Sequence, residues 1–271
     1  MPDSQPISWR RALIDAVRGV HHDYTEGSLN RAIFLLAVPM VLEMCMESLF
    51  GVVDVFWVAR LGADAIATVG LTETGLTLVF VMAIGLSVGA TAVVARRIGE
   101  KDQAGAGVAA IQAILLGLLI SSVVAVIGSI FAPDLLRVLG GSESVVRTGT
   151  NYTRMILAGS AAVFLLFLIN AVFRGAGDAA VAMRVLWLAN LVNIILNPFL
   201  IFGWGPFPEL GVTGSAVGTT IGRGTGVLLQ LWILFRGNGR IAIRREQLRV
   251  EAKVMFGMLR LSLTSMFQYL V

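Results

Sequence analysis

The stretch LLAVPMVLEMCMESLFGVVDVFWV, residues 35–58, is long and apolar enough to cross a lipid bilayer, yet it contains three acids. At about 100° per residue along a helix, Glu47 is rotated roughly 40° from Glu43, and Asp54 roughly 20°, so all three project from one face. An ionised acid at the bilayer centre costs about 2.5–3.5 kcal/mol. This one-sided row therefore predicts the wall of a polar cavity and a pathway for a cation or a proton.

The composition of the whole chain indicates an all-α integral membrane protein. Of its 271 residues, 56% are hydrophobic and 14% are charged, whereas a soluble domain carries about 25% charged residues. A seventh apolar stretch starts near Val254 and continues to Val271, so we expect a chain that is truncated in its seventh helix. The six complete stretches are Ile33–Ala59, Ile66–Ala95, Val108–Ala132, Met155–Phe173, Val181–Phe202 and Val212–Phe235.

Basic residues are distributed unevenly between the two sides of these six spans. Most of the 21 lysines and arginines fall in the N-terminal leader and in every second loop after it, which places those segments in the cytoplasm. The net charge of +4 thus reflects topology and predicts no nucleic-acid partner. We expect a multi-pass protein of the cell inner or plasma membrane with a cytoplasmic N-terminus. The expected divisions are a leader with an amphipathic surface helix (1–30), a six-helix lobe (31–236), a basic cytoplasmic linker (237–253) and the beginning of a second lobe (254–271).

Further polar residues inside the spans need partners in lipid. In the fifth span Asn193 and Asn197 share a helix face, so they either bond a neighbouring helix or line the cavity opposite the acids. Arg223 in the sixth span is expected to pair with a carboxylate, and Glu73 in the second span faces either the cavity or the membrane interface. Close helix packing is predicted along the sixth span, where Gly214, Gly218, Gly222 and Gly226 recur every four residues, and at Gly85 and Gly89 of the second.

Several segments together resemble the multidrug and toxic compound extrusion (MATE) transporters. They are PMVLEMCMESLFGVVDVFWVARLGADAIATVGL, GLSVGATAVVARRIGEKDQAGAG, NAVFRGAGD, ANLVNIILNPFLIFG and LGVTGSAVGTTIGR, in the family's order and spacing. The resemblance implies the N-terminal lobe of a twelve-helix, two-lobe fold. It also implies antiport, in which H⁺ or Na⁺ moves inward while amphipathic, often cationic, compounds leave by alternating access.

The resemblance also assigns roles to individual residues. Asp54 matches the acid that binds the proton or cation, which makes it a possible Na⁺ ligand, and Asn193 matches an asparagine of that site. Asn197 stands where some members carry a second acid. Two residues are assigned to the substrate cavity: Asn170, which falls on a polar position of the fourth helix, and Glu73. Glu43 and Glu47 are additional acids that we group with the coupling site. No cofactor besides the coupling ion is implied, and the second lobe is absent from this chain.

Three alternatives stay open at this stage. A flippase for lipid-linked oligosaccharides shares the architecture, but its cavity should be rich in Arg or Lys. A membrane-embedded enzyme is disfavoured because the two histidines, His21 and His22, lie in the leader, and no catalytic or metal-ligand constellation lies within the spans. The chain could also be a half that packs with other subunits and does not itself transport.

Overall fold

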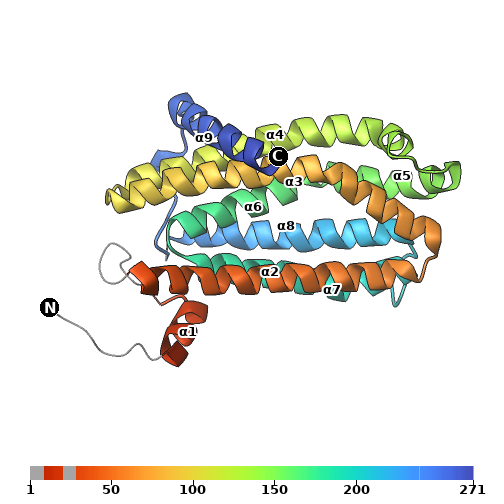
Figure 1. Ribbon diagram of the computed structural model, residues 1–271, viewed down its shortest axis with the longest axis horizontal. Helices are drawn as coiled ribbons and strands as arrows, with labels where there is room; N and C mark the ends of the chain where they lie inside the picture. The colour runs from red at the N-terminus through yellow and green to blue at the C-terminus, as the bar shows by residue number, and fades with distance from the viewer. Residues whose placement is uncertain (1–8, 21–28, 238, 271) are drawn as a thin grey trace.

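The computed structural model describes residues 9–20, 29–237 and 239–270, and this part of the chain is an elongated bundle of helices without strands (Figure 1). Most helices run roughly parallel or antiparallel along the long axis, and α1 lies outside the bundle at one end. The helices are α1 (Trp9–Arg18), α2 (Leu29–Ala59), α3 (Ala63–Gly99), α4 (Gln103–Val138), α5 (Glu143–Ala158), α6 (Ser160–Gly175), α7 (Ala179–Phe202), α8 (Val212–Arg236), the short 3-10 helix η1 (Arg245–Gln247) and α9 (Ala252–Leu270).

Five segments of the described chain are long and apolar enough to span a membrane: α2, α3, α4, the pair α5–α6 and α7. α8 has 25 residues but is not among them, because Arg223, Gln230 and several glycines lower its hydropathy. The fourth span is longer than expected. It begins at Glu143 rather than Met155, since the polar α5 runs into the apolar α6 with only Gly159 between them.

The glycines of α8 form a close contact with α7, as the four-residue spacing predicts. A Cβ at Gly214 would overlap the backbone of Leu200, and one at Gly222 would lie 2.5 Å from the carbonyl oxygen of Ala189. Gly218 faces the side chain of Asn197 in the same way. Because no side chains intervene, α7 and α8 approach closely enough for short polar side chains to bond between them.

The second pair of glycines packs α3 against α9. A Cβ at Gly85 would overlap Met266, and one at Gly89 would overlap Ser262 and lie 2.7 Å from the carbonyl oxygen of Met258. The start of the seventh helix therefore covers α3 along a small-residue seam, which agrees with the packing expected there.

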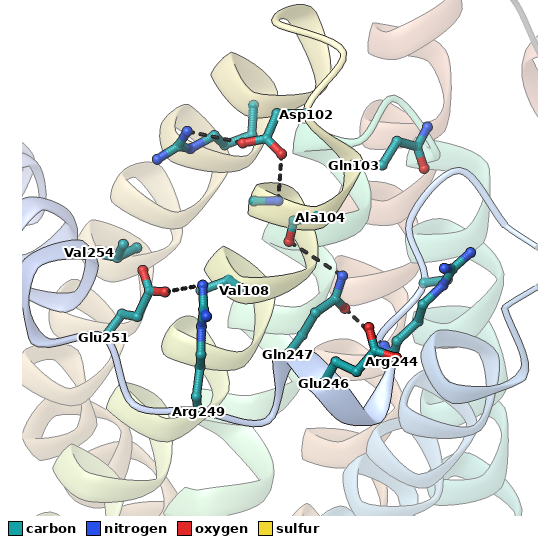
Figure 2. Close-up of a pocket in the computed structure, with 13 residues that line it drawn as sticks. Asp102, Gln103, Ala104, Val108, Arg244, Glu246, Gln247, Arg249, Glu251 and Val254 are labelled. Carbon is teal, nitrogen blue, oxygen red and sulfur yellow. Dashed lines mark hydrogen bonds and ion pairs between the residues drawn. The ribbon is translucent and has the colours of Figure 1, made fainter.

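The basic linker is a docked segment rather than a loose loop. Gln112 of α4, fully buried, donates to the carbonyl oxygen of Arg249 over 2.7 Å and accepts from the backbone N–H of Glu251 over 2.9 Å. Figure 2 shows a second contact, in which Gln247 lies over the first turn of α4 and donates to the carbonyl oxygen of Ala104. Two glutamine side chains thus fix the path of the linker between α8 and α9.

The packing of α8 can be tested with a matched pair of glycines. Gly222→Ala should destabilise the protein by about 1–3 kcal/mol, because the added methyl group overlaps the backbone of α7. Gly224→Ala on the same helix should be neutral or slightly stabilising, since nothing lies within 4 Å of the new Cβ. The measurement is thermal unfolding in detergent. Equal unfolding temperatures for the two variants would contradict the seam.

Candidate functional site

Asp54 lies at the junction of α2, α7 and α8. Its side chain is buried, and its Oδ1 accepts hydrogen bonds from Asn197 Nδ2 over 2.5 Å and from Ser215 Oγ over 2.6 Å. Asn197 comes from α7 and Ser215 from the first turn of α8, so one carboxylate joins three helices. In the described part of the chain Asp54 makes no ion pair, and its charge is stabilised by these two neutral donors.

Two amide oxygens beside this carboxylate have no hydrogen-bond donor. Asn193 Nδ2 donates to Thr219 Oγ1 over 2.9 Å, but the Oδ1 atoms of Asn193 and Asn197 are both buried without a partner among the described residues. A buried acceptor without a donor costs about 1–3 kcal/mol. Gly218 lies against both amides: a Cβ at this position would overlap Asn197 Oδ1, so the missing side chain makes room for the amide of Asn197. A carboxylate with two unsatisfied amide oxygens is a set of hard oxygen ligands that suits Na⁺ or a proton.

Glu47 lies about two turns before Asp54 and pairs with Arg223. Arg223 Nη2 of α8 is 3.6 Å from Glu47 Oε1, and Asn190 Nδ2 of α7 donates to Glu47 Oε2 over 3.0 Å. Arg223 also lies over the ring of Phe80 at 5.8 Å from its centroid. The pairing expected for Arg223 is therefore found, and Glu47 is its partner.

Glu43 begins a second polar network one turn earlier on α2. Arg174 Nη1 of α6 donates to both carboxylate oxygens, over 3.0 and 3.3 Å, and Asn170 Nδ2 donates to Glu43 Oε1 over 3.2 Å. Asn170 in turn accepts a hydrogen bond from Gln230 Nε2 of α8 over 2.7 Å. In this structure Asn170 is a buried bridge between α6 and α8, with 2% of its surface exposed, and it lines no open cavity.

These contacts change the electrostatic picture drawn from the sequence. The three acids do face one side of α2, but Arg174 compensates Glu43 and Arg223 compensates Glu47. Asp54 is the one acid of the row without an arginine within ion-pair distance among the described residues. The prediction of a polar cavity wall rested on the acids of this helix alone, and the structure adds the arginines that pair with two of them, because a helical wheel shows which way a residue points and not what another helix places opposite it.

Glu73 lies apart from these networks. Its side chain on α3 is exposed, and within the described chain it makes no hydrogen bond or ion pair. Among the described residues, no hydrogen bond or ion pair links its side chain to the Asp54 cluster.

Four residues of the polar networks were not singled out from the sequence as site residues: Arg174, Ser215, Thr219 and Gln230. A signal was available for two of them, since Ser215 and Thr219 are one helical turn apart on α8 and adjoin the glycine face. Arg174 lies in the last turn of an apolar helix, where an arginine is typical of the membrane interface. Its position in the sequence therefore does not indicate a buried partner.

A cavity of about 650 Å³ lies beside the linker, between the start of α4 and residues 242–254. Two of its arginines are paired with acids: Arg97 lies 3.0 Å from Asp102, and Arg249 lies 2.6 Å from Glu251, the latter pair visible in Figure 2. None of the polar residues predicted for transport lies there. We therefore take the Asp54 cluster as the candidate site.

The Glu43–Arg174 pair should behave as a buried ion pair. Removing one partner leaves an uncompensated charge, so Glu43→Gln and Arg174→Gln should each destabilise the protein by about 3–5 kcal/mol. The double variant should be much less destabilised than the sum of the two. A double-mutant cycle on unfolding in detergent measures this coupling, and additive effects would show that the two groups do not interact.

Comparison with known proteins agrees with this architecture. The MatE family model matches residues 39–199. The chain is 32% identical over 198 residues to the probable multidrug resistance protein YoeA of Bacillus subtilis, covering 73% of this chain and 43% of that protein. It is 29% identical to the FAD transporter of Shewanella oneidensis, with coverages of 73% and 44%.

A solved structure described as the outward-facing conformation of a multidrug resistance MATE family transporter is also similar. It superposes with a TM-score of 0.82 at 28% identity and covers 95% of this chain and 55% of that one. The chain thus spans about half the length of the relatives it matches. Since the family model covers more than half of the chain, the chain belongs to the MatE family.

Proposed function

We propose that this chain is the N-terminal lobe of a multidrug efflux antiporter, in which inward movement of H⁺ or Na⁺ drives export of amphipathic compounds. The observation that carries the proposal is the buried carboxylate of Asp54, which makes no ion pair within the described chain and is bonded by Asn197, an amide whose own oxygen has no donor there. In this assignment α2 to α8 form the lobe in an inner or plasma membrane, with the N-terminus and the linker in the cytoplasm, and α9 begins the second lobe.

The hydrogen bonds of Asp54 supply a mechanism for coupling. As a carboxylate, Asp54 accepts from Asn197 and Ser215 and holds α2 against α7 and α8. A proton on Asp54 turns it into a donor, which needs an acceptor, and the amide of Asn197 would offer its unpartnered Oδ1 if it rotated. A Na⁺ ion would instead draw the carboxylate and the amide oxygens toward itself. Either ion changes which groups join the three helices, and a change of this kind can bias a two-state transporter.

The nature of the exported compound follows from charge. A cationic compound is attracted to the uncompensated Asp54 and to the exposed Glu73, so coupling ion and substrate would compete for one negative region. The alternative is an anionic substrate. Arg174 and Arg223 balance the charges of Glu43 and Glu47, so these two acids would not repel an anion. The similarity to an FAD transporter keeps this alternative testable.

Transport should depend on Asp54. In inverted membrane vesicles containing the full-length transporter, an imposed Na⁺ or pH gradient should drive accumulation of a fluorescent cationic dye, and Asp54→Asn should abolish it. Asp64→Asn is the matched control, because this exposed acid in the first turn of α3 belongs to no polar network described above. Dye transport that survives in Asp54→Asn would overturn the mechanism. Gradient-driven movement of flavin in place of dye would favour the anionic substrate.

The position of Asn197 offers a gain-of-function test of cation binding. Asn197→Asp places a second carboxylate beside Asp54, and Na⁺ should then stabilise the protein against thermal unfolding at a concentration on the order of tenfold lower than for the unaltered chain. K⁺ at equal concentration is the ionic-strength control. An unchanged response to Na⁺ would contradict a role for this position in cation binding.

A further inference from the structure

The amphipathic helix α1 is attached to the bundle by one face. Ala16 is buried, whereas Leu13 and Ile14 are each 48% exposed. Arg184 Nη2 of α7 donates to the carbonyl oxygen of Val17 over 2.8 Å. This bond fixes the C-terminal end of α1 to the beginning of α7. The helix lies beside the end of the bundle at which α2 begins (Figure 1), so it presents adjacent apolar side chains where the membrane spans end.

A cavity of about 230 Å³ lies next to this contact, where α7 begins and α8 ends. Its charged lining includes two exposed arginines, Arg184 of α7 and Arg236 of the last turn of α8. Between them the surface is apolar, formed by Val181 and Ile233 among others. The site therefore combines two guanidinium groups with an apolar floor.

The positive charge of this cavity is not compensated from within. The acid among its described lining residues, Asp178, accepts from the backbone N–H of Arg240 over 3.1 Å and lies 3.7 Å from the Nε of the same residue. Arg236 lies over the ring of Trp232, 4.7 Å from its centroid. Neither Arg184 nor Arg236 has a carboxylate partner in the part of the chain that the structure describes. Two positive charges are left to attract an anion.

We propose that this cavity binds the phosphate headgroup of an anionic phospholipid, whose acyl chains lie along the exposed apolar surface of α1 and α8. Guanidinium groups match the geometry of phosphate oxygens with paired N–H donors. Leu13 and Ile14 on α1, and the exposed Trp232 on α8, supply apolar surface for the chains. The cytoplasmic leaflet, where the proposed orientation places this end, is the leaflet rich in anionic lipid in the membranes that carry such a surface charge.

The proposal can be tested by lipid retention. The purified full chain is mixed in detergent with equal amounts of phosphatidylglycerol and phosphatidylcholine, and bound lipid is counted by native mass spectrometry. Phosphatidylglycerol should be retained selectively, and Arg236→Gln should reduce this retention about fivefold. This variant removes no hydrogen bond of the structure, so a folding defect is not expected. Arg184→Gln combined with Arg236→Gln should remove the selectivity.

The matched control removes two charges elsewhere. Arg137 and Arg147 line an open cavity of about 580 Å³ that includes Glu143, and the double variant Arg137→Gln/Arg147→Gln should retain phosphatidylglycerol as the unaltered chain does. Loss of retention in this control, or unchanged retention in Arg236→Gln, would contradict a localised site.

A soluble anion distinguishes a lipid from a free phosphate. Inorganic phosphate or glycerol phosphate, added in large molar excess over the lipid, should leave phosphatidylglycerol bound, because the acyl chains contribute to its binding. Displacement by either anion at concentrations equal to that of the lipid would overturn the assignment to a phospholipid. Because lipid retention is measured without transport, the lipid proposal can hold or fail separately from the proposed antiport.

Discussion

Compensation of charge within an apolar bundle is the constraint on which this structure depends. An acid in a membrane span is costly unless a neighbouring helix supplies a counter-charge or hydrogen-bond donors. α2 carries three such acids on one face, and neighbouring helices satisfy all three: α6 bonds Glu43, whereas α7 and α8 bond both Glu47 and Asp54. The rotation of α2 and the identity of its neighbours follow from this requirement. What distinguishes Asp54 is that its hydrogen-bond donors are neutral, so within the described chain no ion pair competes with a mobile cation for its carboxyl group.

The surface of α8 that packs against α7 also carries polar groups of the candidate site. The glycines that allow α7 to approach closely also leave room for the amides of Asn193 and Asn197, and Gly218 contacts both. Ser215 and Thr219 alternate with these glycines and donate to, or accept from, the polar groups between the helices. A side chain at Gly218 would therefore disturb the helix pair and the proposed cation site together. This explains why a helix too polar to qualify as a span by hydropathy still lies inside the bundle.

The sequence predicts most of the fold but only part of the site. Apolar length and helical period identify the spans, and the four-residue glycine spacing identifies the seams, because both are local properties of one helix. The shared direction of Glu43, Glu47 and Asp54 is likewise local and correct. The compensation by Arg174 and Arg223 depends on which helices become neighbours, and neither hydropathy nor a helical wheel contains that information. The polar first half of the fourth span was missed for a related reason, since α5 is stabilised by burial against other helices rather than by its own apolarity.

The central claim is that Asp54, and neither Glu43 nor Glu47, is the acid that exchanges a cation. Infrared difference spectroscopy of the reconstituted protein, recorded on addition of Na⁺ and on a change of pH, reports carboxyl groups that change protonation or coordination. The account predicts a carboxyl signal that is lost in Asp54→Asn and kept in Glu47→Gln. A signal that persists in Asp54→Asn, or that disappears in Glu47→Gln, would contradict it.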